Sequence, residues 1–136
     1  MIPTLLVLVF LLAAPTPIAQ IVRAPAMMSS HGELWFYVRI QRKPDQLRLR
    51  VEAWLLEAVS WADQFPNAVD VDSQGPSLRF EEKELLRSTD FQLDTAATMY
   101  HVIWRKLDPG TYDLVPKIEV RPGAWQRGQA FRLVVQ

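Results

Sequence analysis

The chain contains no cysteine among its 136 residues. A disulfide framework and a lipid-modified cysteine anchor are therefore both excluded, and the fold must be stabilised by its hydrophobic core alone. Without residues 1–19, which are predicted below to be a signal peptide, about 117 residues remain, and a domain of that size buries roughly two thirds of its surface. An exported domain without cysteine fits a bacterial envelope better than an animal extracellular space.

The chain also lacks an excess of charge, with 15 basic and 15 acidic residues. A surface that follows nucleic acid phosphates needs positive charge, so no nucleic acid partner is expected. Neither of its two histidines, His31 and His101, has a second ligand at zinc-binding spacing. Five glycines form no phosphate-binding loop, and no serine stands on a nucleophile elbow. The sequence therefore predicts a protein that is not an enzyme and has no cofactor.

An apolar run over residues 5–14 stands near the N-terminus. It is too short to cross a bilayer of about 30 Å, but it matches the central region of a signal peptide. We predict a signal peptide over residues 1–19 with cleavage after Ala19, and Ala26 is the second candidate. Because no Lys or Arg precedes the run, an uncleaved N-terminal anchor is the alternative. The predicted location is the periplasm or the outside of the cell.

Apolar and polar residues alternate in several segments, which is typical of strands with one buried face. The predicted strands are residues 34–40, 47–54, 78–80, 88–93, 100–107, 111–120 and 130–135. Pro116 removes a backbone donor from one of them, which predicts an edge position or a bulge there. Residues 20–33 have no such period and are predicted to be a flexible leader. The folded domain is therefore predicted to span residues 34–136.

Residues 47–62 also have apolar side chains at helical spacing. We predict a strand to Trp54 and leave residues 55–65 open between strand and helix; one continuous helix would contradict the fold prediction. Residues 66–76 are polar and rich in turn formers, so a surface loop is expected there. The acidic residues from Glu81 to Glu84 are interpreted as a solvated charge run.

The strongest turn signal is Pro109-Gly110, in which Pro fixes φ and Gly accepts a left-handed conformation. The surrounding pattern W-x-x-L-x-P-G-x-Y, ending at Tyr112, resembles exported bacterial immunoglobulin-like domains, and residues 38–52 are similar to the opening of such proteins. Tyr112 resembles the corner tyrosine of immunoglobulin-like and fibronectin type III-like sandwiches, whose phenol bonds to nearby backbone. The resemblance implies an all-β immunoglobulin-like β-sandwich of about six to seven antiparallel strands. It implies no catalytic residue.

Aromatic residues supply the first candidate binding site. Trp35 and Tyr37 share a strand face with Arg39, opposite the apolar face that begins at Leu34. We expect the two rings to be partly exposed and able to contact a partner protein or a sugar, with Trp125 as a further ring.

Acidic residues supply the second candidate. Counted from Asp70, acids stand at positions 1, 3 and 12 (Asp70, Asp72 and Glu81), with Gly75 at position 6, as in an EF-hand calcium loop. Positions 5 and 7 carry Gln and Pro, so the match is partial. A solvated acidic loop is the alternative interpretation.

Taken together, these patterns predict a non-catalytic exported module. It would bind or support another envelope or extracellular protein through a sheet face or an exposed edge strand. Carbohydrate binding by the exposed aromatic residues is the alternative function, and a calcium-binding loop or an enzyme is less favoured.

Overall fold

The computed structural model describes residues 16–60 and 78–136. Within them the chain forms an all-β sandwich of nine strands with no helix, and hence with no helix that crosses a membrane. The strands are β1 (Ala19–Val22), β2 (Met27–Met28), β3 (Glu33–Ile40), β4 (Arg48–Ser60), β5 (Leu78–Gln92), β6 (Met99–Arg105), β7 (Gly110–Arg121), β8 (Ala124–Arg127) and β9 (Phe131–Val135). The all-β prediction is confirmed.

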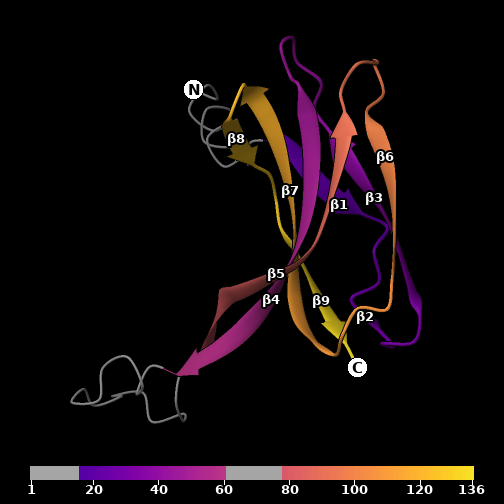
Figure 1. Ribbon diagram of the computed structural model, residues 1–136, viewed down its shortest axis with the longest axis vertical. Helices are drawn as coiled ribbons and strands as arrows, with labels where there is room; N and C mark the ends of the chain where they lie inside the picture. Colours follow the sequence, from indigo (N-terminus) through magenta and orange to yellow (C-terminus); the bar gives the residue numbers. More distant parts are fainter. Residues whose placement is uncertain (1–15, 61–77) are drawn as a thin grey trace, which may run out of the picture.

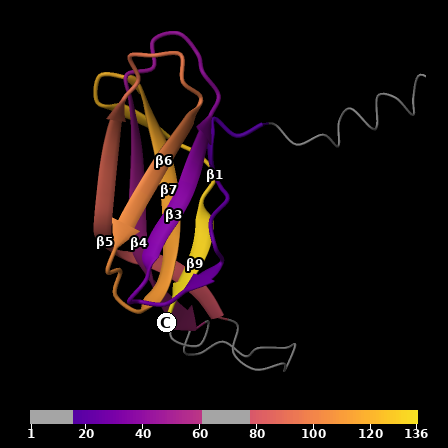
Figure 2. The same ribbon diagram turned by 90° about the vertical axis from the view of Figure 1, so that its right-hand side faces the viewer.

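Two sheets pack face to face (Figures 1 and 2). The smaller sheet has the order β1-β3-β6, and the larger has the order β2-β9-β7-β4-β5, with β8 continuing along β7 beyond β9. Neighbouring strands are antiparallel except β2 and β9. β4 and β5 extend beyond the rest of the larger sheet (Figure 1), because β4 pairs with β7 only as far as Leu55.

The core lies between the sheets and is built by alternate residues. On β3 every second residue from Leu34 to Ile40 is buried, as the alternation predicts. Phe36 meets Trp104 of β6 edge-on, with ring centroids 5.3 Å apart. The larger sheet contributes Leu114 and Ile118 from β7, both fully buried. Burial of such side chains is the main source of stability in a chain without disulfides.

β4 and β5 differ from the prediction. β4 continues through residues 55–60, so the helical alternative is wrong there, because pairing with β5 and β7 overrides the helix propensity of the segment. β5 is one strand of 15 residues that includes the charges from Glu81 to Glu84, and these charges stand on an edge strand facing solvent. Residues 61–65 and the predicted loop over residues 66–76 lie outside the described residues.

Pro116 also differs from the prediction, since it lies in β7 between β4 and the strands β8 and β9. Its carbonyl accepts a hydrogen bond from Gly128, in the break between β8 and β9. The N–H that proline lacks points to the same side as its carbonyl, so it falls at this break and leaves no gap in a ladder.

The predicted leader over residues 20–33 is a second correction, because it holds β1 and β2. β1 pairs with β3, and Ile18 and Ala19 are buried in the core. The Ala19 carbonyl accepts a hydrogen bond from Gln129 (2.8 Å), and a side chain on Gly128 would place its Cβ 2.4 Å from that oxygen. Four residues are too few for a strand period to be recognised. Cleavage after Ala19 would remove two core residues from the domain.

Candidate functional site

The outer face of the three-stranded sheet carries an apolar patch. We call it the outer patch, and it consists of Trp35 and Tyr37 from β3 and of Met99, His101 and Ile103 from β6. The strand register places Trp35 opposite Ile103 and Tyr37 opposite His101. Trp35 is 52% exposed, Ile103 44% and Met99 40%. Sequence analysis finds the β3 half of the patch, whereas the β6 half depends on which strand pairs with β3.

The rings of the outer patch meet at different angles: His101 stacks on Tyr37 but is tilted to Trp35. His101 lies 4.6 Å from Tyr37 with planes 15° apart, and 4.9 Å from Trp35 with planes 59° apart. The Trp35 and Tyr37 rings are therefore far from parallel and form no flat platform. Arg23 places its guanidinium 5.9 Å from the Tyr37 ring centroid, which covers part of that ring.

The two ends of the outer patch carry different charges. At one end Glu33 pairs with Arg105 (2.7 Å) and accepts a hydrogen bond from the Trp35 indole. These contacts, that of Trp35 first, lower the pKa of Glu33. At the other end Arg39 forms no ion pair with any described residue. Arg23 lies beside Tyr37 on the β1 side of the patch, because it follows Val22, the strand partner of Tyr37. The patch is therefore neutral at one end and positive at the other.

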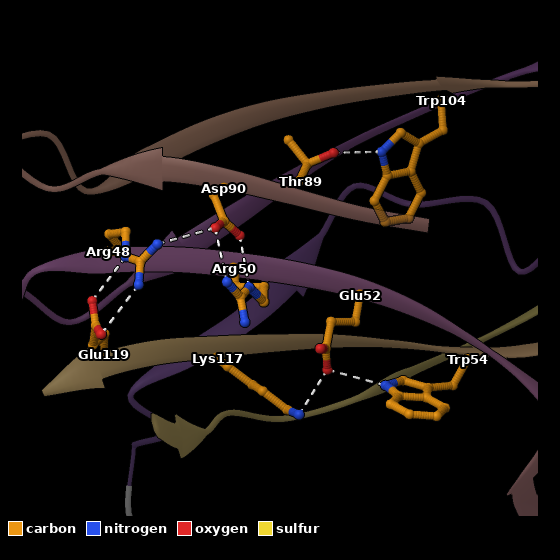
Figure 3. A network of polar contacts seen from close by, with 9 residues as sticks. All are labelled: Arg48, Arg50, Glu52, Trp54, Thr89, Asp90, Trp104, Lys117 and Glu119. Carbon is orange, nitrogen blue, oxygen red and sulfur yellow. Dashed lines mark hydrogen bonds and ion pairs between the residues drawn. The ribbon is translucent and has the colours of Figure 1, made fainter. Parts of the chain in front are cut away.

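Trp125 does not join this patch. It lies on β8 of the larger sheet, with the guanidinium carbons of Arg50 and Arg48 at 4.3 Å and 5.2 Å from its ring centroid. Figure 3 shows how both arginines are held: Arg48 contacts Glu119 at 2.8 Å, and Arg50 contacts Asp90 at 2.8 Å. The hydrogen bond from Arg48, followed by that from the Gly123 N–H, lowers the pKa of Glu119.

The remaining polar groups in Figure 3 are also paired. Buried Glu52 contacts the ammonium of Lys117 (2.7 Å) and the indole N–H of Trp54 (3.0 Å). Between the two sheets, the Trp104 indole donates to the Thr89 hydroxyl (2.8 Å). Because each charge meets its opposite, this face is a stabilising network and offers no open site.

The proposed calcium ligands are not brought together within the described structure. Asp70 and Asp72 lie outside the described residues. Glu81 stands on β5 and pairs with Arg79 at 2.5 Å. Among the described residues no three His, Cys, Asp or Glu side chains form a group that fits a metal ion. Calcium binding stays a prediction that concerns the segment before β5.

Tyr112 and the turn before it have a structural role. The fully buried Tyr112 phenol donates to the Asp108 carbonyl at 2.6 Å, which is the kind of contact that the sequence resemblance implies. Gly110 has a positive φ of 156°, and a Cβ there would lie 2.6 Å from Leu55 Cδ1. Pro109, Gly110 and Tyr112 thus fix the chain as it passes from the smaller sheet to the larger.

Comparison with family models finds no match, and comparison with curated proteins finds none. Among solved structures, the chain is similar to the PmoD soluble domain from Methylocystis sp. ATCC 49242 (Rockwell), with 9% identity and a TM-score of 0.46 over 91% of this chain and 95% of that one. It is also similar to a β-glucosidase from Listeria innocua in complex with glucose, with 14% identity and a TM-score of 0.39 over 86% of this chain and 15% of the enzyme. Similarity at this level carries no argument about function.

Proposed function

We propose that this chain is an exported, non-catalytic immunoglobulin-like module that binds another envelope or extracellular protein through the outer patch. The observation that carries the proposal is the set of exposed apolar side chains gathered on one sheet face, with Trp35, Ile103 and Met99 each at least 40% exposed. Contiguous exposed apolar surface on a small soluble domain marks an interaction site. Large aromatic and Arg side chains are the residues that dominate the energy of protein interfaces.

The topology supports the immunoglobulin-like part of the proposal. Three strands, β1, β3 and β6, face a larger sheet whose centre is β9-β7-β4, and these positions correspond to strands A, B, E and G, F, C of such sandwiches. The corner contact of Tyr112 stands at the start of β7, the strand that corresponds to F. The apolar run over residues 5–14 supports export.

The geometry favours a protein partner over a sugar. A polysaccharide lies on rings that share one plane, whereas Trp35 and Tyr37 are tilted by different angles to the same imidazole, and Trp125 belongs to the other sheet. An irregular apolar surface with one arginine at its end (Arg39) and one at its side (Arg23) is instead suited to an apolar protein surface with acidic residues at its margin. The partner of this module would therefore carry both.

Site-specific photo-cross-linking in the source cells tests the proposal. A photoreactive amino acid replaces Trp35, and a control replaces Gln126, which is exposed on the larger sheet. We expect a discrete protein adduct at position 35, none at position 126, and loss of the adduct when Ile103→Glu is added. The same adducts from both positions, or none at position 35, would overturn the proposal. Calorimetric heat with envelope glycans that Trp35→Ala abolishes would establish sugar binding instead.

A further inference from the structure

The edge strands of the two sheets differ in how they are protected from pairing with another chain. The edge of β1 is closed, because Gln20 bridges to Gln129 of the other sheet. The edge strand β5 is protected by charge: seven of its 15 residues are charged, and two register irregularities interrupt its pairing with β4. Charges and bulges are the means by which proteins prevent an edge strand from pairing with another chain.

β6 has none of these protections. Its residues from Met99 to Trp104 carry no formal charge apart from any on His101, and its pairing with β3 is regular throughout. Arg105 ends the strand, and its charge is already held by Glu33. An uncharged edge with regular pairing and exposed apolar side chains is a surface on which another strand adds.

The backbone of β6 also offers free groups in a regular order. Ile40 donates to the Thr98 carbonyl, so residues 98, 100, 102 and 104 point toward β3. Met99, His101 and Ile103 therefore direct their N–H and C=O groups away from the sheet, and no described residue bonds to them. At the next outward position, the Arg105 carbonyl accepts a hydrogen bond from Arg87 (2.8 Å), which ends the free stretch.

We propose that two copies of this chain pair through β6 in antiparallel fashion about a twofold axis at His101. In this register Met99 of each copy lies opposite Ile103 of the other, and His101 lies opposite its own copy. The two three-stranded sheets then form one six-stranded sheet. About six backbone hydrogen bonds form across the junction, two for each of three bonded pairs.

Several features point to a second copy as the occupant. A contact about a twofold axis requires a surface that is complementary to itself. The neutral segment of β6 meets this requirement, because Met99, His101 and Ile103 form an apolar-polar-apolar pattern that is the same from either end. Arg105 would lie opposite Ala97 of the other copy, so no like charges meet. The chain as a whole has a formal net charge of zero, so two copies do not repel each other.

The dimer goes beyond the proposed function and does not depend on it. It would place two outer patches on one continuous sheet face, so a partner with two matching sites would bind with the gain that multivalency provides. Failure of the dimer leaves the cross-linking result at Trp35 unaffected. Failure of that cross-linking leaves the mass of the protein in solution unaffected.

The first test measures the oligomeric state of the purified protein by sedimentation equilibrium. We expect a dimer whose dissociation constant rises at least tenfold in Ile103→Lys. The reason is that pairing would bury part of the lysine side chain, and removing its charge from water costs free energy. Leu85→Lys is the matched control, since Leu85 is 41% exposed on the protected edge strand β5, against 44% for Ile103. It should dimerise as the unmodified chain does. A monomer at all concentrations, or equal weakening by both substitutions, would overturn the proposal.

The second test fixes the register and uses the absence of native cysteine. Residues of a bonded antiparallel pair have Cα atoms about 5.5 Å apart, which a disulfide spans. Met99→Cys and Ile103→Cys should cross-link when the two variants are mixed. Neither should cross-link alone, because like positions are displaced by about 13 Å along the strands. Cross-linking of Ile103→Cys with itself, or none in the mixture, would overturn the register and the proposal with it.

Discussion

Two tyrosines give a matched pair of substitutions with opposite expected effects. The Tyr112 phenol donates to the Asp108 carbonyl at 2.6 Å. The Tyr100 hydroxyl is buried on β6 and has no hydrogen-bond partner among the described residues. Phenylalanine keeps the ring in both places and removes the same oxygen atom. Any difference between the two variants therefore reports the hydrogen bond and not the packing.

The magnitudes follow from the two environments. A net hydrogen bond contributes about 0.5–1.5 kcal/mol, so Tyr112→Phe should lose about 1 kcal/mol of unfolding free energy. A buried hydroxyl without a partner costs about 1–3 kcal/mol, so Tyr100→Phe should be neutral or stabilising by up to about that amount. For a domain of this size, 1 kcal/mol corresponds to roughly 4 °C in the melting temperature.

Urea unfolding followed by tryptophan fluorescence measures both variants. The slope of free energy against urea should stay constant, since neither substitution changes the surface exposed on unfolding. A second measurement varies pH. Burial raises the pKa of the Tyr112 phenol above its ordinary value of 10.0. The unfolded chain therefore loses this proton first, and the stability that Tyr112 provides is complete below pH 10 and declines above it. The difference in unfolding free energy between the native chain and Tyr112→Phe should therefore become smaller above pH 10.

Equal destabilisation by Tyr112→Phe and Tyr100→Phe would refute this reasoning, because it would show that the hydrogen bond to the Asp108 carbonyl does not distinguish the two hydroxyls. A gain of stability in Tyr112→Phe would refute it more directly. In that case the corner contact would not stabilise the turn before β7.

Two further predictions concern an ion pair and the first strand. Contacts with Arg48 and the Gly123 N–H lower the pKa of Glu119, so its contribution to stability is present above its ordinary pKa of 4.5 and is lost as the pH falls below it. The unfolding free energy of Glu119→Gln should therefore fall less steeply with decreasing pH than that of the native chain. An equal slope for the two chains would contradict this. A chain of residues 20–136 should be less stable than one of residues 16–136 by about 3 kcal/mol or more, because it lacks buried Ile18 and Ala19 and the hydrogen bonds that their carbonyls accept. Equal melting temperatures for the two chains would show that Ile18 and Ala19 do not contribute to stability.

The strands that sequence analysis predicts well are those with one face in the core and one in solvent. β3 is the clearest example, with Leu34 and Phe36 buried and Trp35 exposed between them. β4 is ambiguous because its outward face is also covered: Glu52 is buried, and Trp54 is half-buried. The polar residues of β4 are therefore not all exposed to solvent, and the alternation of apolar and polar residues along the strand is less clear. β1 is missed because four residues hold too little pattern.

The outer patch shows a different limit. That Trp35, Tyr37 and Arg39 share a face follows from the period of a strand and needs no knowledge of the fold. That Ile103 and Met99 complete the face depends on the pairing of β3 with β6, residues 60 or more positions apart in the chain. The same dependence on pairing places Trp125 on the other sheet, since nothing in its local sequence indicates which strand β8 joins.

The edge strands β5 and β6 show which properties of an edge can be predicted from the sequence and which depend on the topology. Which strands lie at an edge is decided by long-range pairing and is not visible in the sequence. Which strands tolerate an edge is visible, because β5 carries seven charges in 15 residues and β6 carries one charge, at its last residue. β5 is therefore an edge strand whose charges protect it from pairing with another strand. β6 is an edge whose composition suits a buried strand, and a second β6 would provide the neighbour that this composition requires.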